Sequence, residues 1–345
     1  MPPPLEPIAP RHKWSPDGSQ VAFESTRNLD GTDAQSANGT YNIWRVNADG
    51  TGLTPLTSAT AVGAGSGAPQ WSPDGSRVVF LSSRKLDGTD AQNGTDNIWR
   101  VNADGTGLRP ITNATAIGLN LPPQLSRDGS KVVFASTRNL DGTDTPTGYF
   151  TFNIWRVNTD GTGLRPITNA TFVSSFYPQW SPDGSKVVFY SSRKLDGTDA
   201  PGTSNIWRVN ADGTGLTPLT SATGAGAAFP QWSPDGSKVV FASTRNVDGT
   251  DTPGTSNIWR VNADGTGLRP ITNATANGAG SGLPQWSPDG SKVVFLSSRK
   301  LDGTDAPNAN HASNIWRVNT DGTGLTPLTS ITANGVLIGL PSFSH

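Results

Sequence analysis

The chain of 345 residues contains no cysteine. This absence excludes disulfide bonds and metal sites built on thiolates. Histidine occurs three times, at His12, His311 and His345, and glutamate only at Glu6 and Glu24. A catalytic triad, an acid–base pair or a metal site needs unlike polar groups that converge on one point. Because so few of these groups are present, we expect no catalytic centre, no metal centre and no cofactor.

Charge and long apolar runs are also scarce. Charged residues make up 15% of the chain, and the net charge is -1. A protein that binds nucleic acid usually carries a basic stripe, which this sequence lacks. No stretch reaches the ~18 apolar residues of a membrane span, and the N-terminal "MPPPLEPIAP" has no signal-peptide core. We therefore expect a soluble monomer that neither binds nucleic acid nor inserts into a membrane.

Repetition is what the sequence has in abundance. The segment "PQWSPDGSKVVF" begins at Pro178 and recurs without change at Pro230 and Pro284. Six copies, spaced 52 to 57 residues apart, start near Trp14, Trp71, Leu125, Trp180, Trp232 and Trp286. A partial copy at 338–345 places Phe343 in the tryptophan slot. Stacked repeats share one core, so residues 1–345 are predicted to form a single domain.

Each copy predicts four short strands separated by turns. The first is "PQWS", followed by Ser-Pro-Asp-Gly, in which proline and glycine favour a tight reversal. The second resembles "KVVFAS", and the third is "NIWRVN", which ends in Asn-Ala-Asp-Gly-Thr-Gly. The fourth, "LRPIT" or "LTPLT", contains a proline that belongs on a sheet edge. Four antiparallel strands in each of six units predict an all-β, six-bladed β-propeller.

These segments carry a resemblance to a known family. "WSPDGSKVVFASTRN" followed by "NIWRVNADGTGLRPIT" resembles the WD40-like repeat of TolB-type propellers over nearly the whole chain. The repeat lapses at 125–129, where Leu125 replaces tryptophan. The chain also lacks the additional N-terminal domain of TolB. The resemblance implies a propeller and a periplasmic or secreted bacterial protein. It leaves the function open among binding scaffolds, peptidase propellers and lyases.

The acidic loops offer a second interpretation. Segments such as "NLDGTD" and "KLDGTD" place two carboxylates three residues apart. Calcium usually takes six to eight oxygen ligands, so a capped turn is the favoured interpretation and calcium the alternative. The calcium candidates are Asp30, Asp33, Asp87, Asp90, Asp141 and Asp144. Of all the aspartates, Asp96 alone falls outside the repeat pattern.

Aromatic residues outside the repeat point to a binding surface. All 11 tryptophans occupy repeat positions, and we expect them in the core. Six other aromatic residues fall between 149 and 177, in two connections that a meander places at the same end of the sheets. They are Tyr149, Phe150, Phe152, Phe172, Phe176 and Tyr177. They are either ligand-binding residues or a plug that fills the channel mouth.

The predicted function is a non-catalytic propeller that recognises a protein, peptide or glycan. The alternatives are a TolB-like hydrolase or lyase, and an engineered or recently amplified repeat protein with no specific activity. We expect the ring of sheets to close. We further expect the C-terminal copy at 338–344 to take the innermost strand position of the first sheet, beside N-terminal strands.

Overall fold

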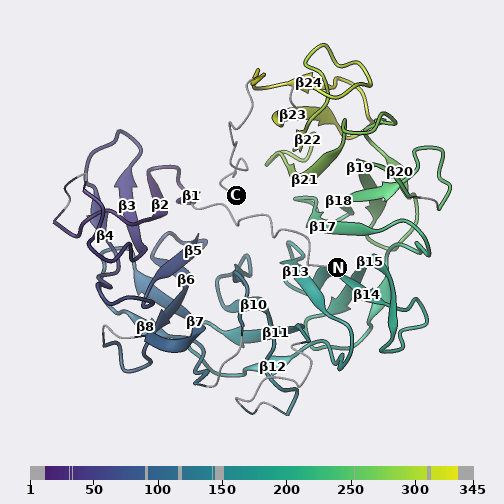
Figure 1. Cartoon of the computed structure of the whole chain (residues 1–345). Helices are drawn as coiled ribbons and strands as arrows, with labels where there is room; N and C mark the ends of the chain where they lie inside the picture. Colours follow the sequence, from purple (N-terminus) through teal and green to yellow (C-terminus); the bar gives the residue numbers. More distant parts are fainter. Residues whose placement is uncertain are drawn as a thin grey trace. The chain divides into compact units, whose positions relative to one another are not determined.

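The computed structural model describes residues 12–30, 32, 34–89, 92–115, 119–141, 143, 151–251, 253–308 and 312–332, and only the backbone of 92–94. The described residues form strands and turns and contain no helix. They build six antiparallel sheets of four strands each, labelled in Figure 1. The prediction of an all-β protein with six four-stranded blades is confirmed.

The first three sheets have the following bounds. The first contains β1 (His12–Trp14), β2 (Gln20–Ser25), β3 (Asn42–Asn47) and β4 (Thr54–Pro55). The second contains β5 (Ser66–Trp71), β6 (Arg77–Arg84), β7 (Gln92–Asn102) and β8 (Arg109–Pro110). The third contains β9 (Gln124–Leu125), β10 (Lys131–Ser136), β11 (Asn153–Asn158) and β12 (Arg165–Pro166).

The remaining three sheets repeat the pattern. The fourth contains β13 (Ser175–Trp180), β14 (Lys186–Arg193), β15 (Pro201–Asn210) and β16 (Thr217–Pro218). The fifth contains β17 (Ala227–Trp232), β18 (Lys238–Arg245), β19 (Pro253–Asn262) and β20 (Arg269–Pro270). The sixth contains β21 (Ser281–Trp286), β22 (Lys292–Ser297), β23 (Asn314–Asn319) and β24 (Thr326–Pro327). The proline-containing fourth strand lies at the sheet edge in every case, as predicted.

The chain divides into two compact units. The first contains residues 1–150, 156–165 and 342–345, and the second contains 151–155 and 166–341. The unit boundary therefore passes through the third sheet. The expectation about the first sheet is wrong, because the N-terminal strand β1 pairs with β2, with Trp14 opposite Val21. The C-terminal copy lies outside the described residues, and closure of the ring remains a prediction.

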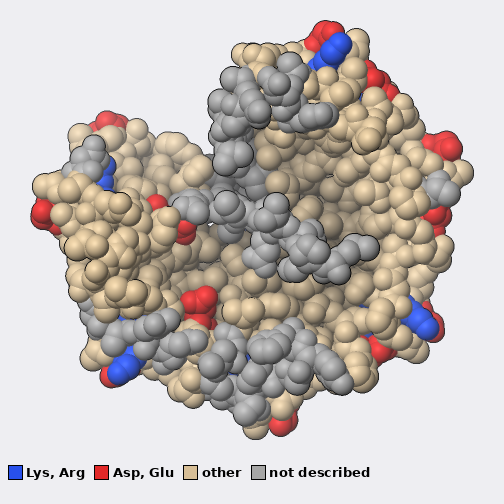
Figure 2. Space-filling model, viewed as in Figure 1, with Lys and Arg blue, Asp and Glu red and all other residues tan. Residues whose placement is uncertain are grey.

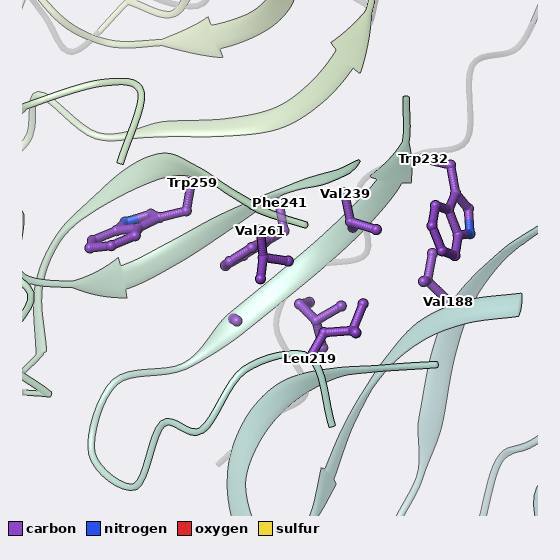
Figure 3. Packing of buried hydrophobic residues seen from close by; sticks show 9 residues of the cluster. Val188, Leu219, Trp232, Val239, Phe241, Trp259 and Val261 are labelled. Atoms are coloured by element: carbon purple, nitrogen blue, oxygen red, sulfur yellow. The ribbon is translucent and has the colours of Figure 1, made fainter. Parts of the chain in front are cut away.

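Tryptophans pack neighbouring sheets together within each unit. In the second unit, Trp232 of β17 lies in one buried cluster with Val188 of β14 and Leu219, as Figure 3 shows. An equivalent cluster in the first unit joins Ala22 of β2 to Trp71 of β5. Large side chains in these sheet-to-sheet contacts remove much apolar area from water. The repeated tryptophans are therefore core residues, as the sequence predicts.

A buried asparagine fixes the edge of each sheet. In the fifth sheet, Asn257 donates from Nδ2 to the carbonyl of Ala274 at 2.8 Å. Its Oδ1 accepts from the hydroxyl of Thr272 and from the backbone N–H of Ala274, both at 2.8 Å. Buried polar groups need hydrogen-bond partners, and this network supplies them just after the short last strand. The asparagine of "NIWRVN" thus ties the third strand to the connection that leaves the sheet.

Candidate functional site

Five aromatic residues of the second unit form one cluster at the end of the sheets where the variable loops lie. Phe152 and Phe176 have ring centroids 5.2 Å apart, and Phe176 lies 5.5 Å from Tyr190. Tyr177 stacks on Tyr190 at 5.7 Å and meets Phe229 edge-on at 5.1 Å. All five are half-buried. We call Phe152, Phe176, Tyr177, Tyr190 and Phe229 the aromatic cluster.

Three of the predicted ligand-binding residues, Phe152, Phe176 and Tyr177, belong to this cluster. Phe172 lies on the connection before β13 and is 62% exposed. Tyr149 and Phe150 lie outside the described residues. Sequence reasoning missed Tyr190 and Phe229, which come from strands β14 and β17. The signal was available, because the positions equivalent to Tyr190 hold leucine, alanine or glutamate in the other copies.

Unusual backbone geometry presents two of these rings. Tyr177 has φ of 52° and Phe229 has φ of 57°, in the left-handed region that residues other than glycine rarely adopt. Each precedes a proline, at a point where the pairing with the next strand shifts register. Ala68 and Leu283 share the geometry. The bulge turns the residue before the proline out of the regular strand alternation.

A carboxylate in the second-to-third loop of one sheet holds the connection that precedes that sheet. Asp251 accepts hydrogen bonds from the backbone N–H groups of Gly224 at 3.1 Å and Ala225 at 3.2 Å. It also pairs with Arg245 at 3.6 Å. Asp199 binds Thr171 and Phe172 in the same way, and Asp305 binds Thr275 and Ala276. The two kinds of variable loop therefore lie side by side, as predicted.

The other acid of each loop caps its own turn. Asp30, Asp87 and Asp141 each accept hydrogen bonds through Oδ1 from the backbone N–H and the hydroxyl of the threonine two residues later. The pKa of each carboxyl is lowered mainly by the threonine hydroxyl. The remaining calcium candidates, Asp33, Asp90 and Asp144, lie outside the described residues. This geometry accounts for the three described acids as turn caps.

Two unlike ionisable residues share one face of the first sheet. Lys13 lies opposite Ala22, and Glu24 follows two positions later on the same strand face. Diagonal neighbours in an antiparallel pair lie about 7–8 Å apart, within reach of long side chains. The residues equivalent to Lys13 are glutamine in the other five sheets. Sequence reasoning missed Lys13 because only the acids and histidines were subtracted from the repeat.

Burial changes the chemistry of Lys13. Desolvation of its ammonium group lowers its pKa to about 8. The face that carries it packs toward the second sheet, where Trp71 Nε1 donates to the Lys13 carbonyl at 3.0 Å. A lysine with a pKa near neutrality can act as a general base. Lys13 is therefore a candidate base on the first unit, and Glu24 lies on the same face of the sheet.

Asp96 of β7 is a third ionisable residue outside the repeat pattern. Burial raises the pKa of its carboxyl. The equivalent positions of the fourth and fifth sheets hold Ser204 and Ser256, which donate to backbone carbonyls. Figure 2 shows small separate groups of charged side chains on the face that it presents, some with an acid beside a base, while uncharged residues dominate. Asp96 is therefore a partly buried acid at a position where two other sheets hold serine.

A metal ion needs several His, Asp or Glu side chains that lie close together. Among the described residues, no three histidine, aspartate or glutamate side chains gather closely enough to hold a metal ion. His12 is the one histidine that falls within the described ranges. The described part of the chain likewise has no helix able to span a membrane.

The chain matches one protein-family model and several curated proteins. The model of the TolB beta propeller domain matches residues 154–338. An uncharacterised protein of Agrobacterium fabrum is 28% identical over 67% of this chain and 65% of its own length. An uncharacterised peptidase of Bacillus subtilis, YuxL, is 30% identical over 36% of this chain and 18% of its own length. The chain thus spans under two thirds of these relatives.

Solved structures with a similar fold include both enzymes and TolB proteins. Oligogalacturonate lyase in complex with manganese aligns with a TM-score of 0.64 at 18% identity, over 94% of this chain and 77% of the lyase. The oligogalacturonate lyase of Vibrio parahaemolyticus aligns with a TM-score of 0.64 at 17% identity, over 96% of this chain and 80% of the lyase. A prolyl endopeptidase aligns with a TM-score of 0.63 at 11% identity, over 92% of this chain and 41% of the endopeptidase.

These matches overturn the prediction of a non-catalytic binding protein. The structural relatives include lyases and peptidases, and a curated relative is itself named as a peptidase. The prediction rested on a search for a triad or a metal cluster alone. The fold prediction, by contrast, is confirmed. With a family model that matches more than half of its residues, the chain belongs to the TolB β-propeller family.

Proposed function

We propose that this chain is a carbohydrate lyase that cleaves an acidic oligosaccharide by β-elimination. The extent of the lyase match carries the proposal. The two oligogalacturonate lyases align over 94% and 96% of this chain and over 77% and 80% of their own. At such low identity the match defines the fold alone, and the activity is our inference. This chain therefore aligns with most of each lyase, and the propeller alone makes up most of such an enzyme.

Lys13 is the residue that we propose as the base. In β-elimination a base removes the proton beside the carboxylate of a uronic acid, a carbon–carbon double bond forms, and the bond to the leaving sugar oxygen breaks. At pH 7, roughly one tenth of a lysine with a pKa near 8 is neutral and able to accept that proton. Glu24 is proposed as a positioning residue, because its carboxylate binds the adjoining strand through Ala68.

The aromatic cluster of the second unit is proposed as a sugar-binding surface of its own, independent of the base Lys13 in the first unit. Aromatic side chains dominate many ligand sites because they offer large contact area, with a few polar groups that fix orientation. Tyr177 and Tyr190 supply both an aromatic face and a hydroxyl. The five rings are half-buried, so the cluster combines a firm support with an accessible edge.

Manganese accompanies one of the lyase relatives, but the described donors of this chain do not fit such a site. We therefore assign no step to a metal. The proton transfer at Lys13 is described without it.

A peptidase propeller is the second candidate, and the 30% identity to YuxL favours it. The peptidases extend far beyond the aligned region, since this chain covers 41% of the prolyl endopeptidase. The lyase proposal accounts for more of its relatives' length. The two candidates predict different products from different substrates.

The test is to incubate the chain with oligogalacturonate and, separately, with a peptide library, and to identify products by mass spectrometry. Elimination gives an unsaturated sugar that is lighter by one water than the product of hydrolysis. The Lys238→Gln variant, which alters the first residue of β18 in the fifth sheet, is the matched control for Lys13→Gln. Cleaved peptides with intact oligosaccharide would transfer the assignment to the peptidase candidate.

A further inference from the structure

The tryptophan slot of the third sheet contains Leu125, and a cavity opens beside it in the first unit. Leu125 pairs with Val132 in the register that Trp180 has with Val187, so the slot itself is unchanged. The cavity has a volume of about 420 Å³. Its lining includes Leu125, Val79, Arg77, Arg100 and the two Ser-x-Asp-Gly turns that begin at Ser72 and Ser126.

The second unit contains a matched site with the tryptophan in place. There, Trp286 lines a cavity of about 160 Å³ at the equivalent position. Its other lining residues correspond one by one to those of the larger cavity, with Lys238 in the position of Arg77. Val240 and Arg260, the equivalents of Val79 and Arg100, are not among them. Trp286 packs with Val240 in a buried cluster, so the indole fills the space that Leu125 leaves open.

The polar lining favours an anion. Arg77 and Arg100 both contribute guanidinium groups, and Arg100 Nε is buried without a hydrogen-bond partner in the described part of the chain. The Nε of Arg260, the equivalent residue of the matched site, is also buried without a partner among the described residues, but Arg260 does not line that smaller cavity. Burial and the neighbouring Arg109 and Arg77 lower the pKa of Arg100, a sign of crowded cations.

The two carboxylates of the lining already have donors. Asp74 accepts from the Ser72 hydroxyl at 2.5 Å and from the backbone N–H of Ser76 at 3.0 Å. Asp128 accepts from the Ser126 hydroxyl at 2.5 Å and from the backbone N–H of Ser130 at 3.0 Å. Both carboxylates therefore already accept hydrogen bonds within their own turns, whereas Nε of Arg100 has no acceptor among the described residues. A carboxylate is the group that guanidinium binds best in a planar, bidentate geometry.

We propose that this cavity binds a small ligand that joins a flat apolar ring to a carboxylate. The ring occupies the space that an indole fills in the other sheets, over Val79 and Leu125, and the carboxylate pairs with Arg100 and Arg77. Ligand sites commonly combine an apolar wall with a few polar groups that fix the orientation of the ligand. The site is separate from the proposed catalytic face of the first sheet and does not depend on the lyase proposal.

Indole-3-acetate is the probe, titrated into the full chain by isothermal calorimetry. Saturable binding at one site per chain is expected, and neutral indole should bind roughly tenfold more weakly because it lacks the charge-assisted contacts. Leu125→Trp fills the slot as in five other sheets and should abolish binding. Trp286→Leu, which opens the matched site beside Lys238, should add a second and weaker site.

Three results would overturn the proposal. They are the absence of saturable heat with the wild-type chain, equal affinity of the Leu125→Trp variant, and equal affinity of indole and indole-3-acetate. Circular dichroism establishes that each variant is folded. If Leu125→Trp does not fold, Arg100→Gln replaces it. Loss of indole-3-acetate binding with retained indole binding then supports the site, and retention of both contradicts it.

Discussion

The Glu24 carboxylate accepts a hydrogen bond from the backbone N–H of Ala68, at 2.9 Å, between the first and second sheets of the first unit. Ala68 has φ of 54°, and it precedes Pro69. The other sheets hold a neutral residue at the position of Glu24. The contact therefore combines a charge specific to one copy with a backbone geometry found in four of them.

Removal of this carboxylate should destabilise the first unit. Glu24→Leu introduces the residue found at position 81 and leaves the Ala68 N–H without its acceptor, at a cost of roughly 1–3 kcal/mol in the free energy of unfolding. Glu24→Gln keeps an acceptor oxygen and should cost less. Urea unfolding followed by tryptophan fluorescence measures both values. Equal stability of the two variants would show that the hydrogen bond contributes nothing.

Asp251 predicts acid sensitivity in the second unit. Burial alone would raise its pKa, but hydrogen bonds from Thr223, Ala225 and Gly224 together lower it to about 2. Because the folded-state pKa lies below the unfolded value, this carboxylate stabilises the fold above about pH 4, and the contribution is lost as pH falls toward 2. The stability difference between wild type and Asp251→Asn should shrink over that range. A difference independent of pH would contradict the prediction.

Phe176 and Phe172 should respond differently to truncation. Phe176 contacts two other rings of the aromatic cluster, whereas Phe172 is 62% exposed. Phe176→Ala should lower the free energy of unfolding by about 1–3 kcal/mol, since ring contacts add to the burial. Phe172→Ala should stay within about 0.5 kcal/mol of wild type. A Phe176→Ala variant as stable as Phe172→Ala would mean that the cluster is loosely packed.

Trp232→Leu tests the meaning of the Leu125 lapse. Trp232 is 8% exposed and packs against Val188 in the second unit (Figure 3). Replacement by leucine should leave a cavity and cost roughly 2–4 kcal/mol, somewhat less than full truncation of a buried aromatic residue. Leu125→Trp fills the equivalent position and should raise the free energy of unfolding. Thermal melts show whether each variant unfolds at a higher or a lower temperature than wild type. A Trp232→Leu variant more stable than wild type would contradict the packing account.

The sequence predicted the strands and turns well because each copy repeats the same local signals. Proline and glycine of Ser-Pro-Asp-Gly specify a turn, and Gly184 indeed adopts φ of +67°. The left-handed conformations of Tyr177 and Phe229 were not predictable, since the residue before a proline normally favours extended geometry. They depend on the bulge in the first strand of each sheet, which is a property of sheet pairing.

The candidate site was predictable only in part. Phe152, Phe176 and Tyr177 stood out because they interrupt the repeat in two neighbouring connections. Lys13 did not, because its lowered pKa depends on desolvation in the fold, which sequence does not display. The reach of Asp251 to another loop was hidden for the same reason, since the two segments are 26–28 residues apart.

The pH dependence of oligogalacturonate cleavage by wild type and Lys13→Gln tests the central claim most directly. Glutamine is the residue of the other five sheets at this position, so the variant should fold normally. Loss of the base should lower kcat by ~100-fold or more. The wild-type rate should rise with pH and level off above about 8, where Lys13 becomes neutral. Cleavage by Lys13→Gln at the wild-type rate, with the same pH profile, would contradict the account.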